Sequence, residues 1–110
     1  MDILIQSDGL TLTEALREAV EEKIGRVAQY APRAIRARVR LRKVAARANQ
    51  AQYVVRVLVE LPGQDMSAEQ IGPEPLLALG ILAEKIERRL RKRKTERLAR
   101  RHKRGLRVKD

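Results

Sequence analysis

The stretch "AIRARVRLRK", residues 34–43, alternates apolar and arginine side chains from Ile35 to Arg42. Successive side chains of a strand point to opposite faces of a sheet, so this alternation predicts a strand with one apolar and one basic face. We therefore expect a sheet that packs against a core on one side and leaves a row of guanidinium groups on the other. The apolar row is Ile35, Ala37, Val39 and Leu41, and the basic row is Arg36, Arg38, Arg40 and Arg42.

Three further stretches predict the remaining strands of this sheet. Residues 2–6 ("DILIQ") place Ile3 and Ile5 on one face, and residues 52–61 ("QYVVRVLVEL") form a strong strand after a predicted loop, "AARANQA", at residues 45–51. Residues 64–71 ("QDMSAEQI") are a weaker candidate, joined to the preceding strand in hairpin fashion by "LPGQ", residues 61–64.

Two segments have the periodicity of amphipathic helices. The first, residues 11–30, repeats apolar side chains at helical spacing and ends before Pro32; either Thr11 or Thr13 can cap its N-terminus. The second follows the break "GPEP" and begins at Pro75, which suits a first helical position. Its apolar stripe is Leu79, Leu82, Ala83, Ile86 and Leu90.

Beyond Leu90 the second helix no longer has a core-facing side. The positions that would continue the stripe are Arg93, Arg97 and Arg101, and burying unpaired charges there would be too costly. We expect the helix to pack as far as Leu90 and then to project, by about 20 Å at roughly 1.5 Å per residue. On the helical wheel, Lys85, Arg88 and Lys92 lie opposite the apolar stripe.

The elements follow the order β-α-β-β-β-α, which predicts a single α+β domain with a four-stranded sheet and two helices on one of its faces. We assign residues 1–94 to this domain and residues 95–110 to a basic extension of the last helix. The chain has 110 residues and no Cys, so disulfides and thiolate metal sites are ruled out. The beginning "MDILI" shows neither a signal peptide nor a membrane span, and we expect a cytoplasmic protein that is monomeric when free.

The charge distribution favours a polyanionic partner. The formal net charge is +11, and residues 1–84 are balanced, so the excess lies in the last helix. A second basic block runs from Arg33 to Arg56 without an acidic residue. These blocks favour nucleic-acid binding over a merely solvated surface. With Tyr30 and Tyr53 as the only aromatic residues, we expect contacts to phosphates and to folded shape rather than base stacking.

The sequence offers no constellation for catalysis. The single His102 lies among cations, the acids Glu18, Glu21 and Glu22 resemble an exposed helix face, and "GPEP" lacks the pattern of a phosphate-binding loop. We expect a protein that is not an enzyme, with no cofactor, no metal ion, no small-molecule substrate and no membrane contact.

Two stretches resemble the family of ribosome hibernation promoting factors, which includes the ribosome-associated inhibitor. They are "LTEALREAVEEKIGRVAQY" (residues 12–30), followed by Pro-Arg and a strand, and "ALGILAEKIERRLRKRK" (residues 78–94), which is similar to the family ending "AIDxLxDKLERQLRKHK". The resemblance covers residues 1–95. It implies a fold similar to the double-stranded RNA-binding domain, and a factor that binds small-subunit rRNA in the mRNA channel near the decoding centre. Such a factor blocks mRNA and tRNA binding and inhibits translation in stress or stationary phase.

Carried over by position, the resemblance implies that rRNA contacts lie on the second helix. The expected contacts are Lys85, Arg88, Arg89, Lys92, Arg93 and Lys94, with Arg36, Arg38, Arg40 and Arg42 as a second-rank surface. The chain departs from the family where "PEPLLALG" (residues 73–80) places Leu76 at a tyrosine and Gly80 at an aspartate. Two alternatives stay open: a free-standing module that binds structured RNA or acts as an RNA chaperone, and a regulator that binds an acidic protein.

Overall fold

The computed structural model describes the backbone of residues 1–44 and 52–108, with side chains as far as Arg100. The predicted order of elements is confirmed, with one short 3-10 helix added. The elements are β1 (Asp2–Asp8), α1 (Glu14–Val27), η1 (Ala28–Tyr30), β2 (Arg36–Val44), β3 (Gln52–Glu60), β4 (Met66–Gly72) and α2 (Pro75–Val108). The loop predicted at residues 45–51 lies outside the described residues.

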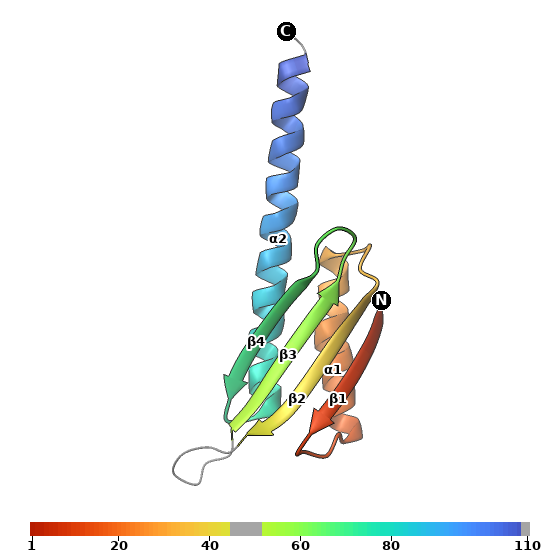
Figure 1. Ribbon diagram of the computed structural model, residues 1–110, viewed down its shortest axis with the longest axis vertical. Helices are drawn as coiled ribbons and strands as arrows, with labels where there is room; N and C mark the ends of the chain where they lie inside the picture. Colours follow the sequence, from red (N-terminus) through yellow and green to blue (C-terminus); the bar gives the residue numbers. More distant parts are fainter. Residues whose placement is uncertain (45–51, 109–110) are drawn as a thin grey trace.

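The four strands form one mixed sheet in the order β1-β2-β3-β4. β1 and β2 are parallel and are connected through α1, whereas β2-β3 and β3-β4 pair antiparallel. In this register Val39 lies between Ile5 and Val57, so the apolar alternation of adjacent strands coincides on one face. Both helices cover that face, as Figure 1 shows, and the arginine row of β2 lies on the other.

The core lies between the sheet and the two helices, as the apolar spacing predicts. The central strands contribute a compact block of fully or nearly fully buried side chains: Ala37, Val39, Leu41, Val55, Val57 and Val59. The helices contribute the residues that repeat at helical spacing: Leu16, Val20, Ile24, Val27, Leu79, Leu82, Ile86 and Leu90. Burying one Val, Leu or Ile side chain contributes about 1.5–3 kcal/mol, so these repeats supply the main driving force for the fold.

Local chemistry sets the ends of the elements. The Oγ1 atom of Thr13 accepts a hydrogen bond from the backbone N–H of Leu16 at 3.2 Å, which identifies Thr13 rather than Thr11 as the N-cap of α1. Gly63 adopts a φ of +89° in the β3-β4 turn, a conformation that other residues rarely take. The prediction that Ile35 faces the core was wrong. It lies one residue before β2, at the end of the sheet, and is 58% exposed.

α2 continues far beyond the sheet. Leu90 is its last buried residue among those whose side chains are described, as the end of the apolar stripe predicts. Arg97, one of the arginines that would continue the stripe, is exposed. Figure 1 shows the C-terminal half of α2 standing clear of the other elements, and the molecule measures 66 × 28 × 18 Å. Over the described part of the chain, no helix combines the length and apolar character that a membrane span requires.

Candidate nucleic-acid interface

One flank of α2 lies along β4 and is held there by its cations. Lys85 donates from Nζ to the side-chain oxygen of Gln70. Arg89 donates from Nη1 to the backbone carbonyl of Ser67 at 2.8 Å, and Arg93 donates from Nη2 to the carbonyl of Gln64 at 2.9 Å. These three cations are one helical turn apart, so they form a ladder between the helix and the edge of the sheet.

The prediction that Lys85 lies opposite the apolar stripe was wrong. Lys85 is half-buried, and its ammonium group reaches across to Gln70 of β4, the strand beside that flank of α2. A helical wheel places a residue only relative to its own helix, and Gln70 belongs to a strand that precedes α2 in the chain.

Arg88 and Lys92 are exposed and lie one turn apart, further round the helix. Together with the ladder they form a surface that we call the basic flank: Lys85, Arg88, Arg89, Lys92 and Arg93. Among the side chains described up to Arg100, none of these five forms a salt bridge. A guanidinium group has five N–H donors, so Arg89 and Arg93 keep donors free after their bonds to β4 and to the turn before it. Within the described part of the chain, the flank thus presents positive charge that pairs with no carboxylate, and hydrogen bonds hold three of its five cations in place.

Lys94 does not lie on the basic flank. About 100° per residue carries it past the core-facing line to the other side of α2. There it lines a notch between α2 and the segment of residues 30–33. The structure therefore brings together five of the six expected contacts on α2 and separates the sixth.

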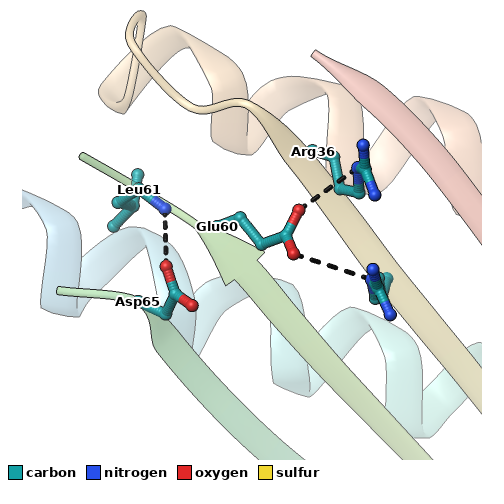
Figure 2. A network of polar contacts seen from close by, with 5 residues as sticks. Arg36, Glu60, Leu61 and Asp65 are labelled. Atoms are coloured by element: carbon teal, nitrogen blue, oxygen red, sulfur yellow. Dashed lines mark hydrogen bonds and ion pairs between the residues drawn. The ribbon is translucent and has the colours of Figure 1, made fainter. Parts of the chain in front are cut away.

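The second-rank surface is largely neutralised by neighbouring strands. Glu60 of β3 pairs with Arg36 at 3.2 Å and with Arg38 at 3.7 Å, and Figure 2 shows this carboxylate reaching across to β2. Arg40 pairs with Asp8 of β1 at 2.8 Å. Arg42, the last of the row, is in register with that same Asp8. The open face of the sheet therefore has much less free positive charge than β2 alone indicates.

An interaction that the sequence did not predict joins α2 to η1. The Nη2 atom of Arg91 donates to the hydroxyl oxygen of Tyr30 at 2.6 Å, and its guanidinium carbon lies 4.7 Å from the centre of the ring. This hydrogen bond raises the pKa of Arg91 above its ordinary value. Only a weak signal for this contact is present in the sequence: Tyr30 lies two residues before Pro32, and Arg91 directly follows Leu90, the last leucine of the apolar stripe.

Metal ligands do not cluster in the described part of the chain. No group of three or more His, Asp or Glu side chains there is close enough to hold a metal ion. The chemistry that the site offers is hydrogen bonding and electrostatic attraction to an anion, supplied by lysine and arginine on a rigid helix.

Comparisons of the sequence place these features in a family. A family model described as "Sigma 54 modulation protein / S30EA ribosomal protein" matches residues 3–98. A ribosome hibernation promotion factor of Deinococcus radiodurans is 36% identical over 84 residues, which is 76% of this chain and 44% of that protein. A factor of the same name from Staphylococcus aureus is 31% identical over 94 residues, 83% of this chain and 47% of that protein. The chain thus spans less than half the length of these relatives.

Comparisons of the structure bear out the fold. A ribosomal subunit interface protein from Coxiella burnetii superposes with a TM-score of 0.74 at 24% identity, covering 86% of this chain and 99% of that one. The N-terminal domain of Protein Y from Thermus thermophilus gives a TM-score of 0.70 at 23% identity, covering 84% and 98%. Both similarities support the α+β arrangement of a four-stranded mixed sheet with two helices.

Proposed function

Because the chain belongs to the sigma 54 modulation protein / S30EA ribosomal protein family, we propose that it is a ribosome hibernation factor. In this proposal it binds rRNA of the small ribosomal subunit near the decoding centre, in the mRNA channel. Bound there, it excludes mRNA and tRNA and inhibits translation during stress or stationary phase. The family relation and the names of the two curated relatives support a role at the ribosome.

The observation that carries the proposal is the basic flank of α2. Its arginines at positions 89 and 93 are fixed against backbone carbonyls of β4 and the turn before it, so the positions of their charges vary little. A row of cations that pair with no carboxylate among the described residues suits the phosphates of folded RNA, whose affinity for a protein comes largely from such contacts. Arg88 and Lys92, which point to solvent, are the side chains that we assign to direct phosphate contact.

We place the open face of the sheet second. Its arginines 36, 38 and 40 already pair with Glu60 and Asp8, so an RNA phosphate would have to compete with these carboxylates. We further propose that residues 1–94 form the ribosome-binding domain and that residues 95–110 add charge to it.

The experiment is co-sedimentation with purified small ribosomal subunits. The Arg88→Glu/Lys92→Glu variant is expected to remain in the supernatant, whereas the wild-type chain pellets. The matched control, Arg17→Glu/Arg26→Glu, makes the same change in charge on the exposed side of α1 and is expected to pellet. If the α2 variant pelleted with small subunits as fully as the α1 control, α2 would not be the ribosome-binding surface.

A second arm tests the proposed inhibition. An mRNA with a bound initiator tRNA, added before the protein, should prevent its co-sedimentation, because both occupy the same channel. The alternative is a free-standing RNA-binding module. It would be supported if the protein bound RNA hairpins but did not sediment with small subunits in extracts of either growing or starved cells.

A further inference from the structure

A notch opens where α2 leaves the sheet, and Arg93 is the one residue of the basic flank that lines it. Its volume is about 530 Å³, within the range of roughly 300–1,000 Å³ that is typical of sites for small ligands. One wall is the segment that follows α1, the second is the turn after β3, and the third is α2. The three walls come from separate parts of the sequence, and their side chains meet only in the folded chain.

The notch combines apolar walls with unbalanced positive charge. Tyr30, Pro32, Pro62 and Leu90 provide flat or aliphatic surface. The cations that line it are Arg33, Arg93, Lys94 and Arg97, and none of the described side chains that line it is acidic. Converging cations repel one another unless an anion binds between them, which is the arrangement that attracts a counter-charge to a concave surface. The open face of the sheet is the opposite case, since carboxylates accompany its arginines.

Tyr30 is held in place from outside the notch. Arg91 stacks over its ring and binds its hydroxyl oxygen, but Arg91 itself does not line the notch. The ring is thereby fixed as a wall rather than free to turn into solvent. A ring fixed in this way suits contact with a flat partner, because little side-chain freedom is lost when the partner stacks.

We propose that the notch binds one unpaired nucleotide of a folded RNA. Its base would pack between Tyr30 and the two prolines, and its phosphate would contact Arg33, Lys94 and Arg97. Arg93 belongs both to the notch and to the basic flank. An RNA strand that runs along α2 can therefore place one nucleotide into the notch while its other phosphates stay on the basic flank. This inference rests on the proposed function insofar as that function makes RNA the partner, and it adds a site for a base to a surface of phosphate contacts.

The test uses two RNA hairpins that differ by a single bulged nucleotide. In a Tyr53→Phe background Tyr30 is the only tyrosine, and the chain contains no tryptophan, so intrinsic fluorescence reports on the notch alone. The bulged hairpin is expected to quench this fluorescence and to bind about tenfold more tightly than the fully paired one, the scale of stacking one base on an aromatic side chain.

Two variants separate the notch from the flank. Arg33→Ala/Arg97→Ala is expected to abolish the preference for the bulge, while Arg88→Ala/Lys92→Ala weakens binding of both hairpins equally and leaves the preference intact. Equal affinity of the wild-type chain for both hairpins, with unchanged fluorescence, would overturn the inference even where co-sedimentation with small subunits succeeds. A free nucleoside triphosphate that quenches Tyr30 at the same concentration as the bulged hairpin would also overturn it, by assigning the notch to free nucleotides.

Discussion

Lys85 and Arg88 carry the same charge on the same helix, yet their surroundings differ. Lys85 bonds to Gln70 and is half-buried, whereas Arg88 is exposed and forms no salt bridge among the described residues. Lys85 should therefore contribute less than Arg88 to the free energy of RNA binding, because Lys85 must first give up its hydrogen bond to Gln70. At the scale of residues, exposure and existing partners rank these cations better than charge does.

Gly80 is a site where a substitution should stabilise the fold. It lies inside α2, and an added Cβ would approach only the Nζ atom of Lys23, at 3.8 Å. Gly80→Ala is expected to raise the free energy of unfolding by about 1 kcal/mol, because alanine is the better helix former. Urea denaturation measures the shift in midpoint. The control is Gly63→Ala, which should lower stability because φ is +89° there. A loss of stability in Gly80→Ala would contradict the helix-propensity reasoning.

Thr13 offers a second test at the level of one side chain. Its hydroxyl accepts a hydrogen bond from the N–H of Leu16, whereas Thr11 forms no such cap. Thr13→Ala is expected to lower the free energy of unfolding by about 1 kcal/mol, the usual cost of removing an N-cap, while Thr11→Ala stays near wild type. Thermal unfolding followed by circular dichroism distinguishes them, and equal effects would mean that the cap does not stabilise α1.

At the scale of elements, the sequence predicted what depends on local periodicity. The alternation in residues 34–43 and the stripe ending at Leu90 were enough to predict a one-sided sheet, two covering helices and the point where α2 loses its core contact. Contacts between elements could not be predicted in this way. Glu60 and Asp8 pair with arginines of β2 because strand pairing brings them together. The register of that pairing cannot be predicted from the sequence of a single strand.

The same limit applies to the candidate site. The charge pattern predicted a basic α2, but the pairing of Lys85 with Gln70, the stacking of Arg91 on Tyr30 and the notch around Lys94 all join segments far apart in the chain. A helical wheel contains no information about which strand or loop lies beside each flank. Sequence reasoning therefore found the element that carries the site and not the arrangement of its side chains.

The end of the core at Leu90 predicts that the projecting part of α2 is dispensable for folding. A chain cut after Lys94 keeps every buried side chain described in the structure. Its free energy of unfolding is expected to stay within about 0.5 kcal/mol of the full chain, as for changes away from the core. Leu90→Ala is the contrasting variant and should cost about 2–5 kcal/mol. Chemical denaturation measures both. A shortened chain as unstable as Leu90→Ala would show that the projecting helix supports the domain.

At the scale of the whole molecule, positive charge is distributed unevenly over the fold. The net charge is +11, and the residues before α2 are nearly balanced. The open face of the sheet has arginines accompanied by carboxylates, whereas no described carboxylate pairs with the cations of the basic flank or lines the notch. An approaching polyanion is therefore drawn towards α2, and the field rather than any single contact sets the orientation in which the two molecules meet.

This asymmetry predicts how salt affects RNA binding by different variants. The slope of log K against log[salt] is negative, and each lost phosphate contact should make it less negative by about 0.7–0.9, because fewer counterions are released. Arg88→Ala/Lys92→Ala is therefore expected to make the slope less negative by about 1.4–1.8. In contrast, Arg38→Ala/Arg40→Ala should leave it nearly unchanged, since Glu60 and Asp8 already compensate these two arginines. Fluorescence anisotropy of a labelled rRNA fragment over a salt series measures both slopes. If Arg38→Ala/Arg40→Ala reduced the magnitude of the slope more than Arg88→Ala/Lys92→Ala does, the open face of the sheet rather than α2 would be the RNA-binding surface.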